Sequence, residues 1–394
     1  MDRLIEISKR KVKNQNETFK RFLFNDIDWN LKLIMVLGPR GTGKTTLLLQ
    51  QLSITEGESV YLSLDDVYFE VNRLVELVES LYAKGYRNFF MDEVHRYSYW
   101  SKDLKILYDN FEDIRMVVTG SSILELAKGQ ADLSRRAVVY KLPGLSFREY
   151  VNLENELKIE PISLQYILEH HSEKANEISD IVEILKHFQK YLSFGYFPFY
   201  RESLLSYHSR LMEITKVIIE MDVAPFEEIN HQTVRNMYKL LYIISQSVPF
   251  IPNISKLSEK LGASRNQILK ILDLLENAEI LNLLKQETKG VSFLQKPEKI
   301  YLNNPNLSFA LSSGLPDKGN LRETFFLSQT KVKHEVTFPK FGDFLLDDQY
   351  LFEIGGAGKT AQQIKGIPSA YIAADEIKSG QGFKIPLWLF GFLY

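Results

Sequence analysis

The sequence predicts an α/β fold in which helices flank a parallel sheet, continued by a longer and mainly helical region. Apolar, strand-like runs alternate with helical segments from residue 32 to 142, which is typical of a parallel sheet with helical connections. A glycine-rich turn at 38–43 separates the first strand from the helix that follows it. At roughly 100 to 200 residues per domain, the 394 residues predict two to four domains.

Five runs rich in β-branched and aromatic residues are expected to form this sheet. They are residues 31–38, 59–64, 88–93, 114–120 and 137–142, and four of the five come after a helical segment. Pro143 and Gly144 directly follow the fifth run and predict the end of the sheet. Residues 1–145 are therefore expected to form the first domain.

The rest of the chain is predicted to form three further parts. Helical periodicity from 146 to 235 predicts an all-helical subdomain. Residues 236–304 contain two helices, a tight turn at Gly262, a third amphipathic helix and two strand-like runs around Gly290, the order of a winged helix-turn-helix. Residues 305–394 combine a helix near Glu323 with short strands, so we expect a fourth, α+β domain. Its apolar end, 385–394, is expected to form a buried last strand.

Composition excludes several classes of protein. With 45% hydrophobic and 25% charged residues, the chain is typical of globular proteins rather than disordered or fibrous ones. Its 48 Lys and Arg against 50 Asp and Glu give no overall charge that attracts nucleic acid, so any DNA contact must be local. The absence of cysteine excludes disulfides and thiolate-metal sites. We find no signal peptide and no apolar run of ~18 residues, so we expect a cytoplasmic protein without membrane contact.

Residues 38–45 satisfy the pattern G-x-x-x-x-G-K-[ST] between a strand and a helix, where such a loop cradles phosphates. The glycines let backbone N–H groups turn toward the phosphates, and the positive end of the helix points at them. Lys44 is expected to reach the β- and γ-phosphates, and the Thr45 hydroxyl to hold Mg²⁺. The predicted nucleotide-binding residues are Gly38, Pro39, Arg40, Gly41, Thr42, Gly43, Lys44, Thr45 and Thr46.

A pair of carboxylates ends the third predicted strand. Asp92 at the strand tip is expected to hold the hydration shell of Mg²⁺, and Glu93 to polarise the water that attacks the γ-phosphate. One further strand, 59–64, lies between the phosphate loop and this pair. That insertion suits P-loop ATPases, whereas simple small-molecule kinases usually lack the Asp-Glu pair. The two motifs together predict that the chain hydrolyses a nucleoside triphosphate.

Other polar residues near the carboxyl edge of the sheet have two interpretations each. Thr119, at the end of the fourth strand, is a candidate sensor of the γ-phosphate. Ser121 and Ser122 follow it and are equally suited to cap the next helix. Arg135 and Arg136 precede the fifth strand, where either could act as an arginine finger on the nucleotide of a neighbouring subunit. The alternative is an ordinary pair of surface arginines.

In these motifs the chain resembles the AAA+ superfamily, and more narrowly bacterial and archaeal ATPases that join an AAA-type core and a winged helix to a nuclease-like domain. The resemblance covers almost the whole chain and rests on GPRGTGKTT, YLSLDD, FFMDEVHR, VVTGSS, DLSRR, LPGLSFREY, FGYFP, FGDFLL and LFEIGG. It implies ATP as the nucleotide and Mg²⁺ as its metal. It also implies a helical lid at 146–235. Arg201 is the nearest candidate for the second sensor arginine, a lid residue expected in many AAA+ proteins.

The second helix of the predicted helix-turn-helix carries outward residues of types that read DNA bases. They are Arg265, Asn266, Gln267 and Lys270, after Ser264 as the N-cap. Four lysines could bring a wing onto DNA phosphates, namely Lys285, Lys289, Lys296 and Lys299. Residues 254–299 carry eight basic and six acidic side chains, a net charge of +2, so contact with a protein stays an alternative to duplex DNA.

The C-terminal range resembles the PD-(D/E)XK nuclease fold, in which acidic residues, a lysine and a metal cut phosphodiesters. The resemblance puts Glu323, Asp343 and Glu353 at the acidic positions, but Gly355 stands where the lysine belongs. Lys359, a few residues on, is the candidate replacement. The interpretations are therefore an active nuclease or a degenerate domain retained for folding, DNA grip or partner binding.

The sequence as a whole predicts an ATPase whose nucleotide state changes the angle between core and lid, and which thereby acts on DNA or a protein partner. One alternative is a DNA-binding regulator that loads ATP with little turnover. A second alternative is an ATP-controlled, metal-dependent nuclease. Self-association is compatible with the sequence but is not required by it.

Overall fold

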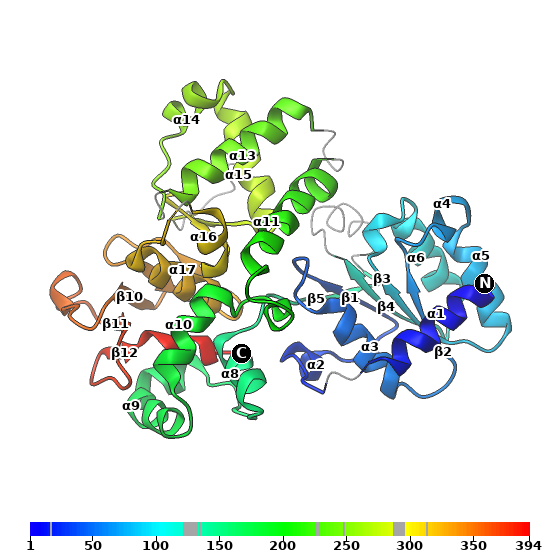
Figure 1. Cartoon of the computed structure of the whole chain (residues 1–394), viewed down its shortest axis with the longest axis horizontal. Helices are drawn as coiled ribbons and strands as arrows, with labels where there is room; N and C mark the ends of the chain where they lie inside the picture. The colour runs from blue at the N-terminus through cyan, green and yellow to red at the C-terminus, as the bar shows by residue number, and fades with distance from the viewer. Residues whose placement is uncertain are drawn as a thin grey trace. The chain divides into compact units, whose positions relative to one another are not determined.

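The computed structural model describes residues 1–15, 18–120, 133, 135–224, 229–246, 249–286, 296–312 and 314–394. The chain forms two compact units, Met1–Gly144 and Leu145–Tyr394 (Figure 1). The boundary lies at the Pro143-Gly144 pair that predicted the end of the sheet domain.

The first unit is a five-stranded sheet with helical connections. In chain order its elements are α1 (Asp2–Lys13), α2 (Leu23–Asp26), β1 (Leu33–Leu37), α3 (Lys44–Ile54), β2 (Ser59–Ser63), α4 (Tyr68–Val71), α5 (Leu74–Ala83), β3 (Asn88–Asp92), η1 (Val94–Arg96), α6 (Trp100–Asn110), β4 (Arg115–Gly120) and β5 (Val138–Lys141). The strand order is β2-β3-β4-β1-β5, and every neighbouring pair is parallel. The predicted α/β fold with a parallel sheet flanked by helices is therefore confirmed.

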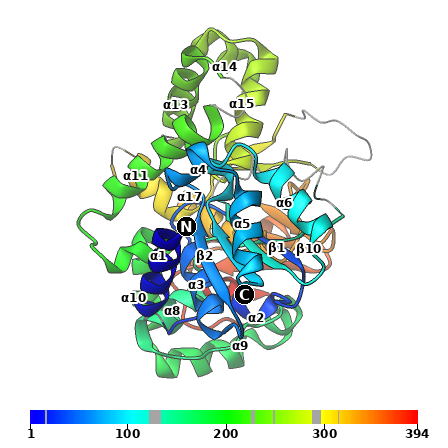
Figure 2. The ribbon, with the colours of Figure 1, turned by 90° about the vertical axis from the view of Figure 1, so that its right-hand side faces the viewer.

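Strand residues alternate between the two faces of this sheet, and each face has its own apolar core. Leu33, Met35 and Leu37 belong to one cluster with buried residues of α5 and α6. Ile34 and Val36 belong to a second cluster with the buried leucines of α3. Helices thus cover both faces (Figure 2), which explains why the strands read as continuous apolar runs.

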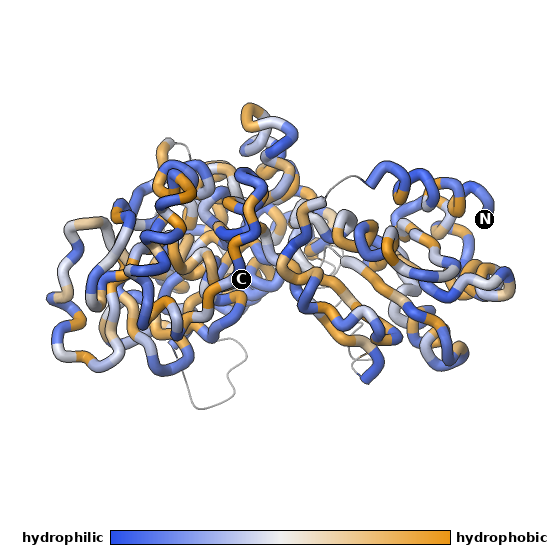
Figure 3. Tube along the Cα trace, turned by 90° about the horizontal axis from the view of Figure 1, so that it is seen from below, coloured by the Kyte–Doolittle hydropathy of each residue, from blue (hydrophilic) through white to orange (hydrophobic). Residues whose placement is uncertain are grey.

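The N-terminal helix α1 is mainly hydrophilic along its length (Figure 3) and buries only Leu4 and Ser8. It nevertheless packs on the sheet, where the Ser8 hydroxyl accepts a hydrogen bond from the backbone N–H of Tyr61 at 2.8 Å. The helix therefore fixes β2, whose neighbour β3 carries the acidic pair.

The second unit begins with helices and ends with a mixed sheet. Its helical elements are α8 (Phe147–Asn155), α9 (Leu164–Ile181), α10 (Ile184–Phe194), η2 (Pro198–Arg201), α11 (Tyr207–Val217), η3 (Ile218–Val223), α13 (His231–Ser245), α14 (Ile254–Leu261), α15 (Arg265–Asn277), α16 (Pro305–Leu311), α17 (Lys318–Thr330), η4 (Ala361–Gln363) and η5 (Leu387–Phe392). Its strands are β6 (Leu281–Leu284), β7 (Lys299–Leu302), β8 (Val336–Thr337), β9 (Phe344–Leu346), β10 (Tyr350–Gly355), β11 (Ala370–Ala374) and β12 (Lys384–Pro386).

Helices α13, α14 and α15 precede an antiparallel hairpin of β6 and β7; that these elements form a winged helix-turn-helix stays a prediction. Gly262 ends α14 with φ of 62°, and Ser264 begins α15 through a capping box with Gln267. Gly290 and Lys289 lie outside the described residues, as do Ser121 and Ser122.

The C-terminal sheet has the order β12-β11-β10-β9-β8, with α17 packed against β10. The expectation that 385–394 forms a last strand is wrong beyond Pro386, because residues 387–392 form the 3-10 helix η5. Proline has no N–H for the next rung of a ladder, which favours the change of direction. The segment is nevertheless buried, as predicted.

The division of residues 146–394 into lid, winged helix and C-terminal domain stays a prediction. Helix α8 contacts η5, and α10 contacts α16, so segments from different predicted parts pack together within one compact unit. Within the described ranges, no helix is both long and apolar enough to cross a membrane.

Candidate functional site

The glycine-rich loop 38–43 connects β1 to α3 at the carboxyl edge of the first sheet. Gly41 and Gly43 have φ of 81° and 95°, a conformation that side chains with a Cβ rarely adopt. A Cβ at Gly38 would lie 2.2 Å from the Leu142 carbonyl oxygen. The loop therefore needs glycine at these positions for reasons of backbone geometry and close packing.

Lys44, the first residue of α3, is buried inside the turn of the loop. Its ammonium donates to the carbonyl oxygens of Gly38 at 2.9 Å and Pro39 at 2.7 Å. Thr42 is also buried, and its hydroxyl donates to the Pro39 carbonyl at 3.0 Å. Lys44 thus holds the loop closed from within, and phosphate oxygens at the loop would be stronger partners for its charge.

Three hydroxyl groups converge on the buried carboxylate of Asp92 at the end of β3. Thr45 donates to Oδ2 at 2.7 Å, and Thr119 at the end of β4 donates to Oδ1. The third donor is Tyr61 of β2, whose hydroxyl lies 2.8 Å from Oδ2. The structure therefore brings together Thr45, Asp92 and Thr119, which the sequence singled out, and adds Tyr61, which it did not.

Burial, followed by the charge of Asp92, raises the pKa of Tyr61 far above its usual value. The phenol therefore stays protonated and acts only as a donor to the carboxylate. The sequence signal for Tyr61 was present but weak: it lies on the strand beside β3 and pairs in register with Phe90, two residues before Asp92.

Glu93 follows β3 in a left-handed backbone conformation with φ of 53°. Its N–H donates to the Thr119 hydroxyl at 3.2 Å. The carboxylate oxygen Oε2 lies 3.4 Å from Nε2 of His95 and 4.0 Å from the Arg40 guanidinium of the phosphate loop. Non-glycine residues in this conformation are uncommon and cluster at functional sites.

His95 lies on the short 3-10 turn η1 and its side chain is only 1% exposed. Burial, and then the positive charges of Arg40, Arg96 and Lys44, lower its pKa to about 3. The imidazole is therefore neutral at physiological pH. The sequence predicts no role for His95, although this residue stands two residues after the acidic pair.

Two family models match the chain. Residues 30–151 match the AAA domain. This match, with the loop and the parallel sheet described above, supports an AAA-type P-loop ATPase domain in the first unit. Residues 185–318 match a domain of unknown function.

Similar whole proteins are themselves uncharacterised. One from Methanocaldococcus jannaschii is 28% identical over 288 residues, which is 67% of this chain but only 58% of the relative. A second protein of that organism is 25% identical over 371 residues, 86% of this chain and 78% of the relative. Among solved structures, a Walker-type ATPase of Pyrococcus abyssi is matched over 74% of this chain and 95% of its own, at 15% identity and a TM-score of 0.43.

The two candidate finger arginines differ in their surroundings. Arg136 holds both carboxylate oxygens of Asp109, from Nε at 2.8 Å and from Nη2 at 2.9 Å. Arg135 is exposed. Arg136 is thus fixed to α6 of its own unit, which leaves Arg135 as the better candidate to reach another molecule.

The residues predicted to face DNA lie at the start of α15 and are exposed, namely Arg265, Asn266, Gln267 and Lys270. The Gln267 side chain accepts from the backbone N–H of Ser264 at 2.8 Å, so it already serves the capping box. Two of the predicted wing lysines also have other partners. Lys285 pairs with Glu276 at 3.2 Å, and the largely buried Lys299 points into the C-terminal acidic residues.

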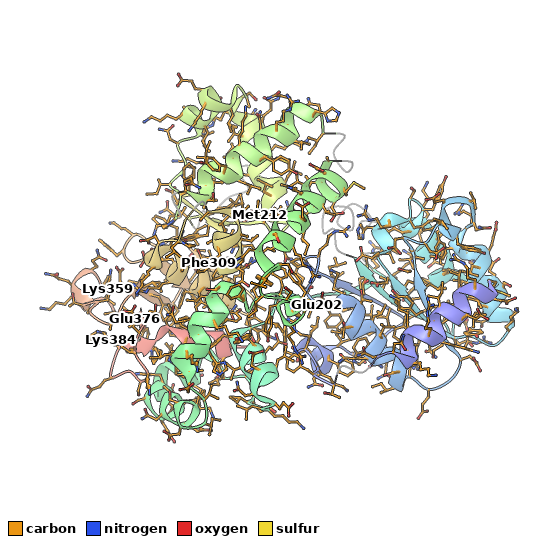
Figure 4. The ribbon with its side chains drawn as sticks, viewed as in Figure 1. Glu202, Met212, Phe309, Lys359, Glu376 and Lys384 are labelled. Carbon is orange, nitrogen blue, oxygen red and sulfur yellow. The ribbon has the colours of Figure 1, made fainter. Side chains whose placement is uncertain are left out.

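The nuclease-like residues form two ion-paired groups. Lys299 of β7 lies 3.4 Å from Glu323 and 3.3 Å from Asp343, and the Tyr301 hydroxyl donates to Glu323 at 2.7 Å. Glu353 on β10 pairs with Lys359, and a Cβ at Gly355 would lie 2.6 Å from the Lys359 side chain. Lys359 (Figure 4) therefore occupies the space that a side chain at 355 would take, and its role as a replacement for the nuclease lysine stays a prediction.

This arrangement does not favour a metal site. Over the described residues, no group of three or more His, Asp or Glu side chains is placed to hold a metal ion. The three acidic side chains that the resemblance implied, Glu323, Asp343 and Glu353, each pair with a lysine instead. Asp343 also accepts a hydrogen bond from the Ile354 N–H at 2.9 Å.

Proposed function

We propose that the chain binds Mg-ATP at the loop 38–46 and hydrolyses it, and that this ATPase acts on a partner bound by the second unit. The observation that carries the proposal is the convergence of Lys44, Thr45, Asp92 and Thr119 at the carboxyl ends of β1, β3 and β4. Ligands of open α/β sheets bind at this edge.

The donor set fits Mg-ATP. A glycine-rich backbone that opens a helix suits phosphate, and the buried ammonium of Lys44 supplies positive charge at the same point. The hydroxyl of Thr45 and the carboxylate of Asp92 are hard oxygen ligands and are already 2.7 Å apart. Bound Mg²⁺ would neutralise charge on the phosphates, and Thr45 and Asp92 would hold it.

Glu93 is the proposed base. Its carboxylate lies beside the phosphate loop rather than within the hydroxyl cluster around Asp92. From this position it can orient and polarise a water molecule for attack on the γ-phosphate. Thr119 contacts both the Asp92 carboxylate and the Glu93 N–H, so it can link the metal-binding residue to the base.

The deciding experiment compares phosphate release by the wild-type chain with that of Glu93→Gln, while ATP binding is measured separately. We expect Glu93→Gln to keep ATP affinity and to lose turnover by about 100-fold or more. Lys44→Ala should instead abolish binding. Tight ATP binding without wild-type turnover under any condition would contradict hydrolysis and favour a regulator that only loads ATP.

Duplex DNA is the proposed partner of the second unit. The exposed Arg265, Asn266 and Lys270 at the start of α15 have the chemistry and position of a recognition helix that follows a tight turn. A protein partner is the alternative, because the local net charge is small. DNA binding that weakens with salt and falls in Arg265→Ala would support DNA, and salt-independent behaviour would favour a protein.

For the C-terminal residues we propose a binding role rather than cutting. Lys299 and Lys359 compensate the acidic side chains that a nuclease would use for metal. We expect no Mg²⁺-dependent DNA cleavage by the wild-type chain. Cleavage that is lost in Glu353→Gln but kept in Glu93→Gln would overturn this view.

A further inference from the structure

His95 reaches the predicted base from the turn that directly follows β3. Its Nε2 lies 3.4 Å from Oε2 of Glu93. The same oxygen lies 4.0 Å from the guanidinium of Arg40. The carboxylate thus faces one nitrogen group from its own turn and one from the phosphate loop.

The turn that carries His95 is firmly supported. The N–H of Arg96 donates to the Glu93 carbonyl at 2.9 Å, and the N–H of Tyr97 donates to the Val94 carbonyl at 3.1 Å. Val94 and Tyr97 are both buried in the apolar core beside α5 and α6. The imidazole therefore has a fixed place relative to the strand end, as a group that orients another side chain must.

The two nitrogen groups differ in what they do to the carboxylate. Arg40 always carries a positive charge, so it holds the carboxylate of Glu93 as one partner of an ion pair. Arg40 also lies in the phosphate loop, where the phosphates of bound ATP would compete with Glu93 for its charge. A neutral imidazole N–H can orient the carboxylate without compensating its charge.

We infer that His95 is a positioning residue for Glu93, which holds the carboxylate toward the γ-phosphate when ATP draws Arg40 to the loop. His95 touches neither nucleotide nor metal and acts through Glu93. The lowered pKa of His95 agrees with this role, because it keeps the ring neutral. The inference rests on the proposed ATPase function.

The test measures kcat, KM and ATP affinity of the full chain for wild type, His95→Ala, His95→Gln and Arg40→Ala. We expect His95→Ala to lower kcat on the order of 10- to 100-fold, since misplacing a catalytic group by an ångström costs about 100-fold, with unchanged ATP affinity. His95→Gln, which keeps a neutral N–H donor, should recover much of the loss. Arg40→Ala should mainly weaken ATP binding.

A double variant separates positioning from a merely structural role. If His95 acts through Glu93, adding His95→Ala to Glu93→Gln should leave the residual single-turnover rate unchanged. Lys102→Ala, an exposed position on α6, is the matched control and should behave as wild type. Thermal unfolding of each variant verifies that it folds.

Each result decides the inference. Unchanged kcat in His95→Ala, or independent effects of His95→Ala and Glu93→Gln, would overturn it while leaving the ATPase intact. A His95→Ala chain that loses ATP affinity together with kcat, with no recovery in His95→Gln, would also overturn it. A wild-type chain that binds ATP but never turns it over would overturn the proposed function and the inference together.

Discussion

Asp92 shows how a single buried carboxylate organises the site through hydroxyl donors. Its partners come from α3, β4 and β2, so three elements meet at one side chain. Hydrogen bonds to a charged group contribute about 1.5–3 kcal/mol each, and leaving such a group short of donors when buried is costly. The hydroxyl of Tyr61 should therefore matter to stability, although the sequence assigns this residue no role.

Tyr61→Phe removes this donor and keeps the ring. We expect the free energy of unfolding of the first unit to fall by about 1.5–3 kcal/mol, the range for a hydrogen bond to a charged group. Urea unfolding in the absence of nucleotide is the measurement. Tyr140→Phe is the control, since its hydroxyl accepts a hydrogen bond from the exposed N–H of Asp28 at 3.2 Å and touches no charged group in that bond. Equal effects of the two changes would argue against a special role for Tyr61.

We expect the lowered pKa of His95 to make the free energy of unfolding fall in acid. Its pKa is lowered from 6.5 to about 3, and the charged groups around it are Arg40, Arg96, Lys44 and Glu93. Between these two pH values the unfolded chain binds a proton at this position and the folded chain does not, so stability rises with pH. The contribution is complete above pH 6.5 and is lost as pH falls toward 3.

We expect the wild-type chain to lose up to about 1.4 kcal/mol more per pH unit below pH 6.5 than His95→Gln does. Unfolding free energies at a series of pH values give the difference directly, and other titrating groups cancel between the two chains. Parallel curves for the two chains would show that the imidazole is not kept neutral by the fold.

Residue roles could be predicted from the sequence only where a motif defines them by spacing. The loop residues and Asp92 belong to such motifs, and the structure brings Thr45, Asp92 and Thr119 together. Tyr61 and His95 depend instead on strand register and on the direction of a four-residue turn. The role of neither residue can be predicted from local sequence pattern. The fold of the sheet and of the turn after β3 sets the distance from Tyr61 to Asp92 and from His95 to Glu93.

At the level of elements, the last segment of the chain shows why apolar character alone misassigns structure. Residues 387–392 are buried as expected, yet they form a 3-10 helix, not a strand. The close approach of Gly391 to α8 offers a reason: a Cβ there would lie 2.4 Å from Cβ of Phe147. The two residues in contact lie near opposite ends of the second unit in the sequence. Local periodicity therefore cannot predict this contact.

Gly391→Ala should therefore strain the junction between η5 and α8. Overpacking a buried site costs about 1–3 kcal/mol, and we expect the unfolding free energy of the second unit to fall by that amount. Gly358→Ala is the matched control, because nothing lies within 4 Å of a Cβ there. If denaturant unfolding gave the same midpoint for both variants, the close packing of Gly391 would be refuted.

For the whole molecule, the two compact units divide after Gly144, at the Pro143-Gly144 turn. Few contacts cross such a boundary, so a local turn signal can mark it. Within the second unit the contacts of α8 with η5 and of α10 with α16 join distant segments. Contacts between segments so far apart in the sequence cannot be predicted from local sequence pattern.

The same boundary is tied to the phosphate loop by one buried side chain. Arg21 donates from Nη1 to the Thr42 carbonyl at 2.5 Å and from Nη2 to the carbonyls of Pro143 and Gly144, both at 2.9 Å. A rearrangement of the loop on binding ATP would therefore be felt at the residues that lead into the second unit. This contact is a candidate route by which the nucleotide state could change the angle between core and lid, as the sequence predicts.

Arg21→Gln shortens and neutralises this connection, so the loop and the chain at 143–144 should move independently. We expect backbone amide exchange at residues 144–146 to rise by about tenfold or more, which corresponds to losing roughly 1.4 kcal/mol of local stability. Mg-ATP should slow exchange there in the wild-type chain but not in Arg21→Gln. Lys20→Gln is the control, because the exposed ammonium of Lys20 lies over the Phe24 ring, 3.9 Å from the ring centroid. An equal response to Mg-ATP in all three chains would show that the nucleotide signal does not pass through Arg21.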